Sequence, residues 1–141
     1  MSKKVKFSIY RYNPEKDAKP YFQNYEVEAG DHDKKLLNVL VKIKDDLDDS
    51  FSFRRSCREG VCGSDAMNIN GRNGLACLTD IASLKQPIVL APIPGLPVIR
   101  DLIVDMTQFF HQYHSIKPYV IDDRPMPERE RLQSPEDRKE L

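Results

Sequence analysis

Alternating apolar and polar residues predict two neighbouring β-strands near the N-terminus. In residues 5–12, three apolar side chains alternate with polar ones, a period of two that is typical of a half-buried strand. Asn13 and Pro14 then open a polar connection, and residues 21–28 return to an aromatic-rich pattern. We therefore expect the two segments to form a hairpin.

A helical pattern follows this hairpin. Apolar residues recur there at three- and four-residue steps, which predicts an amphipathic helix with one buried face. That face comprises Leu36, Leu37, Val39, Leu40, Ile43 and Leu47. Asp31 or Asp33 is expected to cap the N-terminus of the helix. Four aspartates at the other end oppose the helix dipole, so we expect the helix to fray there and the carboxylates to be solvated. These are Asp45, Asp46, Asp48 and Asp49.

Shorter elements are predicted in the rest of the chain. Residues 54–65 read as a loop, and residues 66–69 as a short strand that turns at Asn70-Gly71, a strong hairpin dipeptide. Residues 87–91 form another apolar strand candidate. From Val98 the apolar spacing predicts a second amphipathic helix, over about 98–114.

Length and composition indicate one globular domain with a polar tail. The domain is expected over residues 1–121, because residues 122–141 contain three prolines, no aromatic residue and dense charge. That composition is typical of a linker or tail. Lysine plus arginine and aspartate plus glutamate number 22 each, so the net charge is zero and gives no reason to expect nucleic acid as a partner.

The sequence carries no targeting or membrane-spanning pattern. The lysines near the N-terminus precede no apolar stretch of the kind found in secretory signals, so the chain is expected in a reducing compartment such as the cytoplasm. The most apolar region, residues 87–99, is interrupted by prolines and is too short to cross a bilayer. Any membrane contact is therefore expected to come through a partner.

Three cysteines and one aspartate form the candidate site. The cysteines are odd in number and lie in one short window, so a disulfide framework explains them poorly. Cys57, Cys62, Asp65 and Cys77 reproduce the plant-type ferredoxin spacing C-x4-C-x2-C with a distant fourth ligand, except that aspartate replaces the third cysteine. Gly60 and Gly63 would let the loop wrap closely and direct backbone N–H groups at cluster sulfurs.

Other interpretations of these residues stay open on the sequence alone. Asp65 is either an iron ligand, since a carboxylate is a monoanion like a thiolate, or an ordinary turn residue. The cysteines could pack in the core or bind zinc, but their polar surroundings disfavour packing and a second zinc knuckle is missing. His111 and His114 could share one helix face, yet no obvious further ligand accompanies them.

Three segments resemble a known family. The runs SCREGVCGSDAMNINGRNGLAC at 56–77, PVIRDLIVDMTQFF at 97–110 and SIKPY at 115–119 are similar to iron-sulfur subunits of the succinate dehydrogenase and fumarate reductase family. The resemblance implies an α+β, beta-grasp, ferredoxin-like domain with a C-terminal helix and polar tail. It also implies that Cys57, Cys62, Asp65 and Cys77 hold a 2Fe-2S cluster, with Asp65 as a variant found in some bacterial members.

The same resemblance implies an electron-carrying rather than substrate-binding role in succinate dehydrogenase, within the tricarboxylic acid cycle and the respiratory chain. Electrons would come one at a time from FAD on a flavoprotein partner and pass toward ubiquinone in membrane-anchor subunits, without acid-base catalysis by this chain. The resemblance implies a second domain with 4Fe-4S and 3Fe-4S clusters after residues 122–141, and this domain is not expected within the 141 residues. The subunit would lie peripherally on the cytoplasmic side of the inner membrane.

Two other function classes compete with this hypothesis. A free-standing soluble 2Fe-2S ferredoxin would share the ligand spacing, but shuttle ferredoxins tend to be strongly acidic and this chain is neutral. A non-redox interaction module would keep the fold without the cluster, and the intact ligand set argues against it. Iron and sulfide content separates the module from both redox hypotheses.

Overall fold

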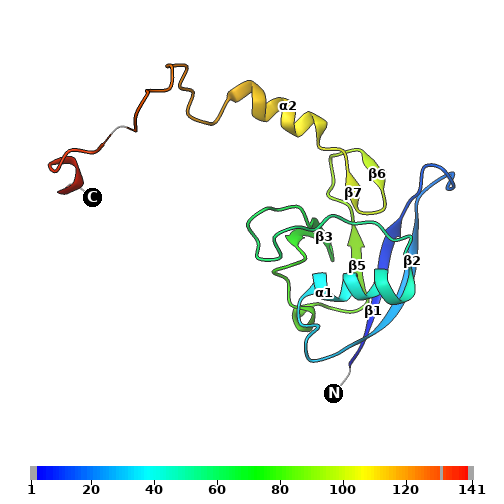
Figure 1. The fold of residues 1–141 in the computed structure, drawn as a ribbon. Coiled ribbons are helices and arrows are strands. Elements are labelled where there is room, and N and C mark those ends of the chain that lie inside the picture. The colour runs from blue at the N-terminus through cyan, green and yellow to red at the C-terminus, as the bar shows by residue number, and fades with distance from the viewer. Residues whose placement is uncertain (1–2, 131, 140–141) are drawn as a thin grey trace. The chain divides into compact units, whose positions relative to one another are not determined.

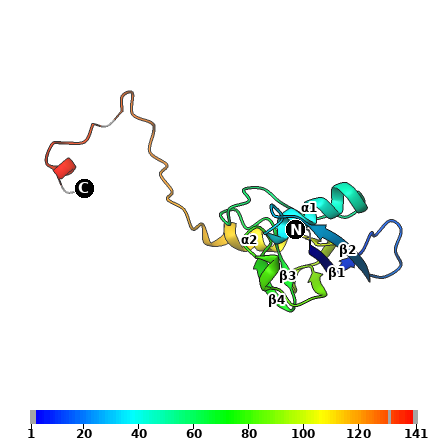
Figure 2. The ribbon, with the colours of Figure 1, turned by 90° about the horizontal axis from the view of Figure 1, so that it is seen from below.

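The computed structural model of the protein describes residues 3–130 and 132–139. The chain divides into two units, Met1–Gln108 and Phe109–Leu141. The first unit holds a mixed sheet with α1 across one face (Figures 1 and 2). The second begins within α2 and continues into the C-terminal segment.

The predicted N-terminal hairpin is confirmed. Strands β1 (Lys3–Arg11) and β2 (Tyr21–Ala29) pair antiparallel, with Arg11 opposite Tyr21 at the turn end. Alternate side chains of both strands are buried, so the period of two in the sequence marks the face that packs into the core.

Three further strands complete the sheet in the order β2-β1-β5-β3-β4. β5 (Ile88–Ala91) runs parallel to β1, whereas β3 (Ala66–Ile69) pairs antiparallel with both β5 and β4 (Arg72–Leu75). Asn70 and Gly71 connect β3 to β4 with φ of 49° and 87°, as the predicted hairpin dipeptide requires. A short 3₁₀ turn, Ile81–Ser83, precedes β5.

The core helix is shorter than predicted and ends differently. α1 spans Leu36–Lys42 and continues as a π-helical turn, Ile43–Leu47, instead of fraying. Each backbone hydrogen bond of a π-helical turn spans five residues instead of four, which shifts the following side chains around the helix axis. Leu47 therefore leaves the apolar face and is 54% exposed. The expectation that Leu47 is buried is therefore wrong.

The predicted aspartate cap is also wrong. The residue that caps α1 is Lys35, whose side chain makes no capping hydrogen bond. Asp33 lies too early in the chain, and its Oδ2 instead accepts a hydrogen bond from the N–H of Gly30 at 2.9 Å. Asp33 therefore closes the turn after β2 and does not cap the helix.

Asp48 corrects the expectation that all four aspartates after the core helix are solvated. Its Oδ2 accepts hydrogen bonds from the Tyr25 hydroxyl at 2.6 Å and from the buried guanidinium of Arg11. Arg11 also donates to Ser50 Oγ at 2.8 Å. The ion pair of Arg11 and Asp48 connects the end of β1 to the segment after the π turn, so Asp48 fixes that segment to the sheet.

The second predicted helix begins later than its pattern indicates. Residues 98–104 form a small hairpin of β6 (Val98–Arg100) and β7 (Ile103–Val104), and α2 spans Thr107–Ile116. Asp101, with φ of 47°, turns the hairpin. Asp105 Oδ1 accepts a hydrogen bond from the N–H of Thr107 at 2.8 Å, which starts the helix there.

The C-terminal segment has little regular structure. The described part of residues 117–139 contains one 3₁₀ turn, Asp137–Lys139, and its boundary with the domain at residue 122 stays a prediction. None of the helices in the described ranges has both the length and the apolar character needed to span a bilayer.

Candidate metal centre

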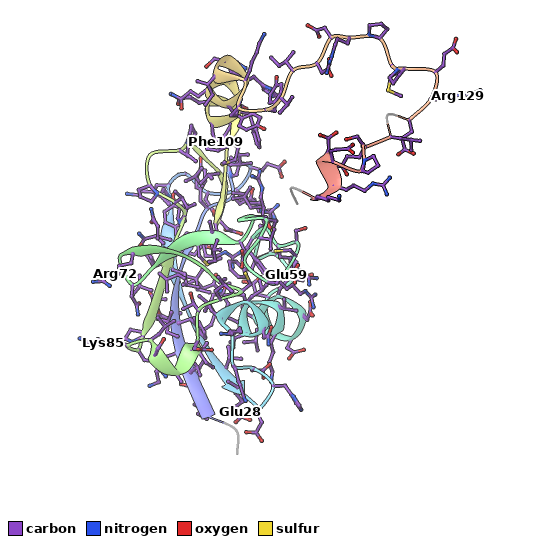
Figure 3. All side chains as sticks on the ribbon, turned by 90° about the vertical axis from the view of Figure 1, so that its left-hand side faces the viewer. Glu28, Glu59, Arg72, Lys85, Phe109 and Arg129 are labelled. Carbon is purple, nitrogen blue, oxygen red and sulfur yellow. The ribbon has the colours of Figure 1, made fainter. Side chains whose placement is uncertain are left out.

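The loop after Phe53 is shaped by left-handed backbone conformations. Arg58, Gly60 and Gly63 have φ of 66°, 77° and 69°. These turns fold the loop around Cys57, whose Sγ accepts hydrogen bonds from the N–H of Glu59 at 3.5 Å and of Cys62 at 3.4 Å. Glu59 marks the exposed loop in Figure 3. Backbone N–H groups are thus directed at a sulfur, and hydrogen bonds of this kind tune the potential of iron-sulfur clusters.

Gly60 brings this loop against the residue after Cys77. A Cβ at position 60 would lie 2.6 Å from Cδ1 of Leu78, and the positive φ is costly for any residue with a side chain. Glycine is therefore needed for both backbone conformation and close approach. Gly60 lies inside the cysteine motif and was expected to shape the loop, whereas no sequence pattern marks Leu78 as part of the site.

The β3–β4 hairpin brings Asp65 and Cys77 together. They stand just outside Ala66 and Leu75, which face each other at the open end of the hairpin. The N–H of Cys77 donates to Asp65 Oδ2 at 2.5 Å. Asp65 is 3% exposed and Cys77 is 4% exposed. A buried carboxylate at this place is not an ordinary surface turn residue.

The thiols of Cys62 and Cys77 have different environments. Cys62 is exposed, and a hydrogen bond with the Ser64 hydroxyl, aided by backbone N–H groups and Cys57, lowers its pKa to about 6. Burial raises the pKa of Cys77, and the carboxylate of Asp65 adds to this effect. The N–H of Gly60 opposes that increase, so the loop and the hairpin meet at Cys77.

The four residues fit a two-iron cluster better than a single metal ion. Across residues 3–130 and 132–139, no three histidine, cysteine, aspartate or glutamate side chains are placed to hold one ion. A zinc site needs three or four such ligands around one centre, whereas a 2Fe-2S cluster takes two protein ligands on each iron. Of the four predicted ligands, Cys57 and Cys62 lie in the loop, whereas Asp65 and Cys77 lie at the ends of the hairpin.

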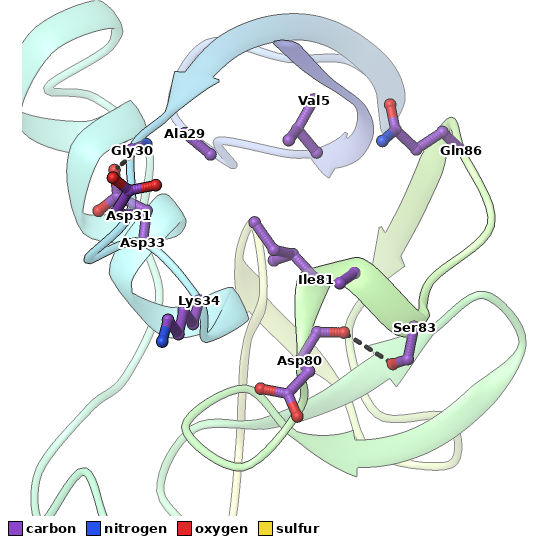
Figure 4. Close-up of a pocket in the computed structure, with 11 residues that line it drawn as sticks. Val5, Ala29, Gly30, Asp31, Asp33, Lys34, Asp80, Ile81, Ser83 and Gln86 are labelled. Carbon is purple, nitrogen blue, oxygen red and sulfur yellow. Dashed lines mark hydrogen bonds between the residues drawn. The ribbon is translucent and has the colours of Figure 1, made fainter. Parts of the chain in front are cut away.

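Two other features lie apart from these residues. His111 and His114 are exposed on α2, and no third ligand joins them within the described ranges. A cavity of about 690 Å³ lies between the ends of β1 and β2 and residues 80–86, and none of the four predicted ligands lines it (Figure 4). No pattern in the sequence indicated this cavity.

Comparison with known proteins indicates a domain that binds a 2Fe-2S cluster. Residues 6–111 match the family described as 2Fe-2S iron-sulfur cluster binding domain. The succinate dehydrogenase iron-sulfur subunit of Coxiella burnetii is 53% identical over 96% of this chain and 57% of that protein. A mitochondrial succinate dehydrogenase [ubiquinone] iron-sulfur subunit of Oryza sativa is 49% identical over 96% of this chain and 49% of that protein. The resemblance found in the sequence is thereby confirmed.

A solved structure confirms the α+β, beta-grasp fold. The Mycobacterium smegmatis Sdh1 complex in the apo form matches with a TM-score of 0.76 over 94% of this chain and 55% of that chain, at 24% identity. The chain spans about half the length of the curated relatives it matches. Since the matched family covers most of its residues, this chain belongs to the 2Fe-2S iron-sulfur cluster binding domain family.

Proposed function

We propose that this chain provides the 2Fe-2S centre of a succinate dehydrogenase iron-sulfur subunit. It would take electrons one at a time from FAD on a flavoprotein partner and pass them toward ubiquinone. The observation that carries the proposal is the meeting of the Cys57–Cys62 loop with the buried Asp65–Cys77 pair. The succinate dehydrogenase names of relatives that are 43–53% identical support the choice of complex.

Each protein group has a defined task in this proposal. Cys57, Cys62, Asp65 and Cys77 would hold the cluster, which supplies a one-electron redox centre when bound. The N–H groups of Glu59 and Cys62 point at Cys57 Sγ and would stabilise negative charge there. The close packing of Gly60 on Leu78 would keep the loop on the hairpin and limit access of water. The chain's own residues thus position the centre and set its potential.

The remaining components of the pathway belong to other parts of the complex. The flavoprotein, the membrane-anchor subunits and a second domain with 4Fe-4S and 3Fe-4S clusters would complete the relay. This arrangement would place the chain peripherally at the membrane, on the cytoplasmic side in a bacterial cell. Co-purification with a flavoprotein in a fixed ratio would distinguish it from a free-standing ferredoxin.

Anaerobic reconstitution of the full chain tests the proposal. Wild type should contain about two irons and two sulfides, with a rhombic S = 1/2 EPR signal after dithionite reduction. Asp65→Asn keeps an oxygen acceptor for the Cys77 N–H but loses the anionic ligand, so the signal should be altered or lost. Asp49→Asn, in the exposed segment after the π turn, is the matched control and should keep it.

Different outcomes contradict different parts of the proposal. An iron-free wild type with an intact circular dichroism spectrum would overturn the electron-transfer function. An unchanged signal in Asp65→Asn would remove Asp65 from the ligand set but leave the cluster on the three cysteines and another ligand.

A further inference from the structure

Ser64 lies against one of the four proposed ligands. Its Oγ is 3.2 Å from Cys62 Sγ, and this hydroxyl makes no other hydrogen bond within residues 3–130 and 132–139. We propose that Ser64 is a potential-setting residue whose hydroxyl donates to the Cys62 thiolate and favours the reduced form of the bound cluster. This inference rests on the proposed function.

The direction of the hydrogen bond follows from the state of the sulfur. With a free thiol, either atom can donate, but a metal-bound cysteine is a thiolate and has no hydrogen to give. The Ser64 hydroxyl is then the donor. Reduction adds one electron and increases the negative charge on the sulfurs, so a donated hydrogen bond stabilises the reduced state more than the oxidised state.

The loop holds Ser64 in this position from both sides. Gly63 turns the chain in the left-handed region, and its C=O accepts a hydrogen bond from the N–H of Ala66 at 3.1 Å. The N–H of Cys62 is fixed on Cys57 Sγ, and Asp65 is buried against Cys77. Ser64 therefore lies between two anchored ligands, and its hydroxyl does not need a new loop conformation to reach Cys62.

The hydroxyl differs from the other hydrogen bonds to sulfur in this loop. Cys57 Sγ receives backbone N–H groups, which no substitution of the donor side chain removes. Cys62 is the exposed cysteine, and the Ser64 hydroxyl adds a side-chain hydrogen bond to the backbone contacts at its sulfur. The residue at position 64 can therefore adjust the potential without changing the ligands or the fold.

Redox titration of the reconstituted full chain, followed by EPR, tests the proposal. Ser64→Ala and Ser64→Val remove the hydroxyl, whereas Ser64→Thr retains it and matches valine in shape. The two hydroxyl-free variants should lower the equilibrium constant for one-electron reduction about tenfold, a midpoint decrease of about 59 mV. Ser64→Thr should stay near wild type. Ser56→Ala, the same change beside Cys57, is the control and should leave the midpoint unchanged.

Iron and sulfide counts on the same samples separate this inference from the proposed function. An iron-free wild type contradicts the proposed function itself. A loaded cluster with equal midpoints in wild type, Ser64→Ala and Ser64→Val overturns only the role of Ser64. If both hydroxyl-free variants lose the cluster while Ser64→Thr retains it, Ser64 acts on cluster retention and the potential-setting role is rejected. An equal decrease in Ser56→Ala also rejects it.

Discussion

Arg11 and Asp101 form a buried ion pair across 90 residues of sequence, in which Arg11 Nε donates to Asp101 Oδ1 at 3.0 Å. Asp101 also accepts hydrogen bonds from the backbone N–H of Tyr12 at 2.9 Å and of Ser52 at 2.8 Å. One carboxylate thus joins β1, the segment after the π turn and the β6–β7 hairpin. All four groups belong to the unit that carries the candidate centre.

Replacing this carboxylate should destabilise the fold strongly. Asp101→Asn keeps a residue type that tolerates the positive φ, but it removes the charge that pairs with Arg11 and places an N–H₂ group against a backbone donor. We expect a loss of about 3 kcal/mol in the free energy of unfolding, measured by urea denaturation. Glu26→Gln, at the exposed pair with Lys4, should leave the urea midpoint nearly unchanged. Equal midpoints for wild type and Asp101→Asn would show that the pair contributes little.

Asp48 should make stability depend on acid pH. Burial alone would raise its pKa, but hydrogen bonds from Ser50, Tyr25 and Arg11 outweigh burial and hold the pKa below its ordinary value of 3.8. A lowered pKa in the folded state stabilises the protein above the unfolded-state pKa, and this contribution is lost as the pH falls below about 4. The stability difference between wild type and Asp48→Asn should therefore shrink from pH 6 to pH 3 in urea titrations. A stability difference that stays constant from pH 6 to pH 3 would contradict a lowered pKa of Asp48 in the folded state.

Two glycines in the loop offer a matched pair of substitutions. Gly60→Ala and Gly63→Ala both place a Cβ at positive φ, which costs about 1–2 kcal/mol. Only the Cβ at position 60 meets Leu78, because nothing lies within 4 Å of the one at position 63. We expect Gly60→Ala to lose more bound iron and more stability than Gly63→Ala. Adding Leu78→Ala to Gly60→Ala should restore iron content and stability to the level of Gly63→Ala. If neither is restored, the contact between position 60 and Leu78 does not restrict the loop.

Asn70 should stabilise the packing of the β3–β4 hairpin on β5. Its Nδ2 donates to the C=O of Lys85 at 2.9 Å, and its Oδ1 accepts from the N–H of Val89 at 2.7 Å. Asn70→Gly keeps the positive φ but removes both bonds, so the free energy of unfolding should fall by about 1–2 kcal/mol. Amide hydrogen exchange at Val89 should accelerate in this variant. Asn70→Asp keeps the acceptor and should protect that amide more than glycine does.

The sequence was most informative where the signal is local. The alternation in residues 5–12 and the Asn70-Gly71 dipeptide predicted the strands and the turn because a single strand or turn determines those patterns. The cysteine spacing likewise indicated the loop and the ends of the β3–β4 hairpin, because the residues concerned lie close together in the sequence. The pairing of Asp65 with Cys77 depends only on a short hairpin, so it was within reach of sequence reasoning.

Prediction failed where distant residues decide the structure. The apolar spacing from Val98 fits a helix, but Asp101 binds Tyr12 and Ser52 and holds that segment as a hairpin. Nothing in the sequence distinguishes Asp48 from the three neighbouring aspartates, because its partner Arg11 is brought beside it only by the fold. The contact of Ser64 with Cys62 depends on the backbone turn at Gly63, which spacing alone does not reveal.

The open end of the β3–β4 hairpin has a consequence for the lifetime of the bound group. Asp65 and Cys77 lie just beyond strands of only four residues each, so fraying of the hairpin separates two of the four proposed ligands. Loss of the cluster would then require a local opening of this hairpin and not unfolding of the whole domain. The half-life of the holoprotein in the presence of a chelator would therefore depend on how often these two short strands separate.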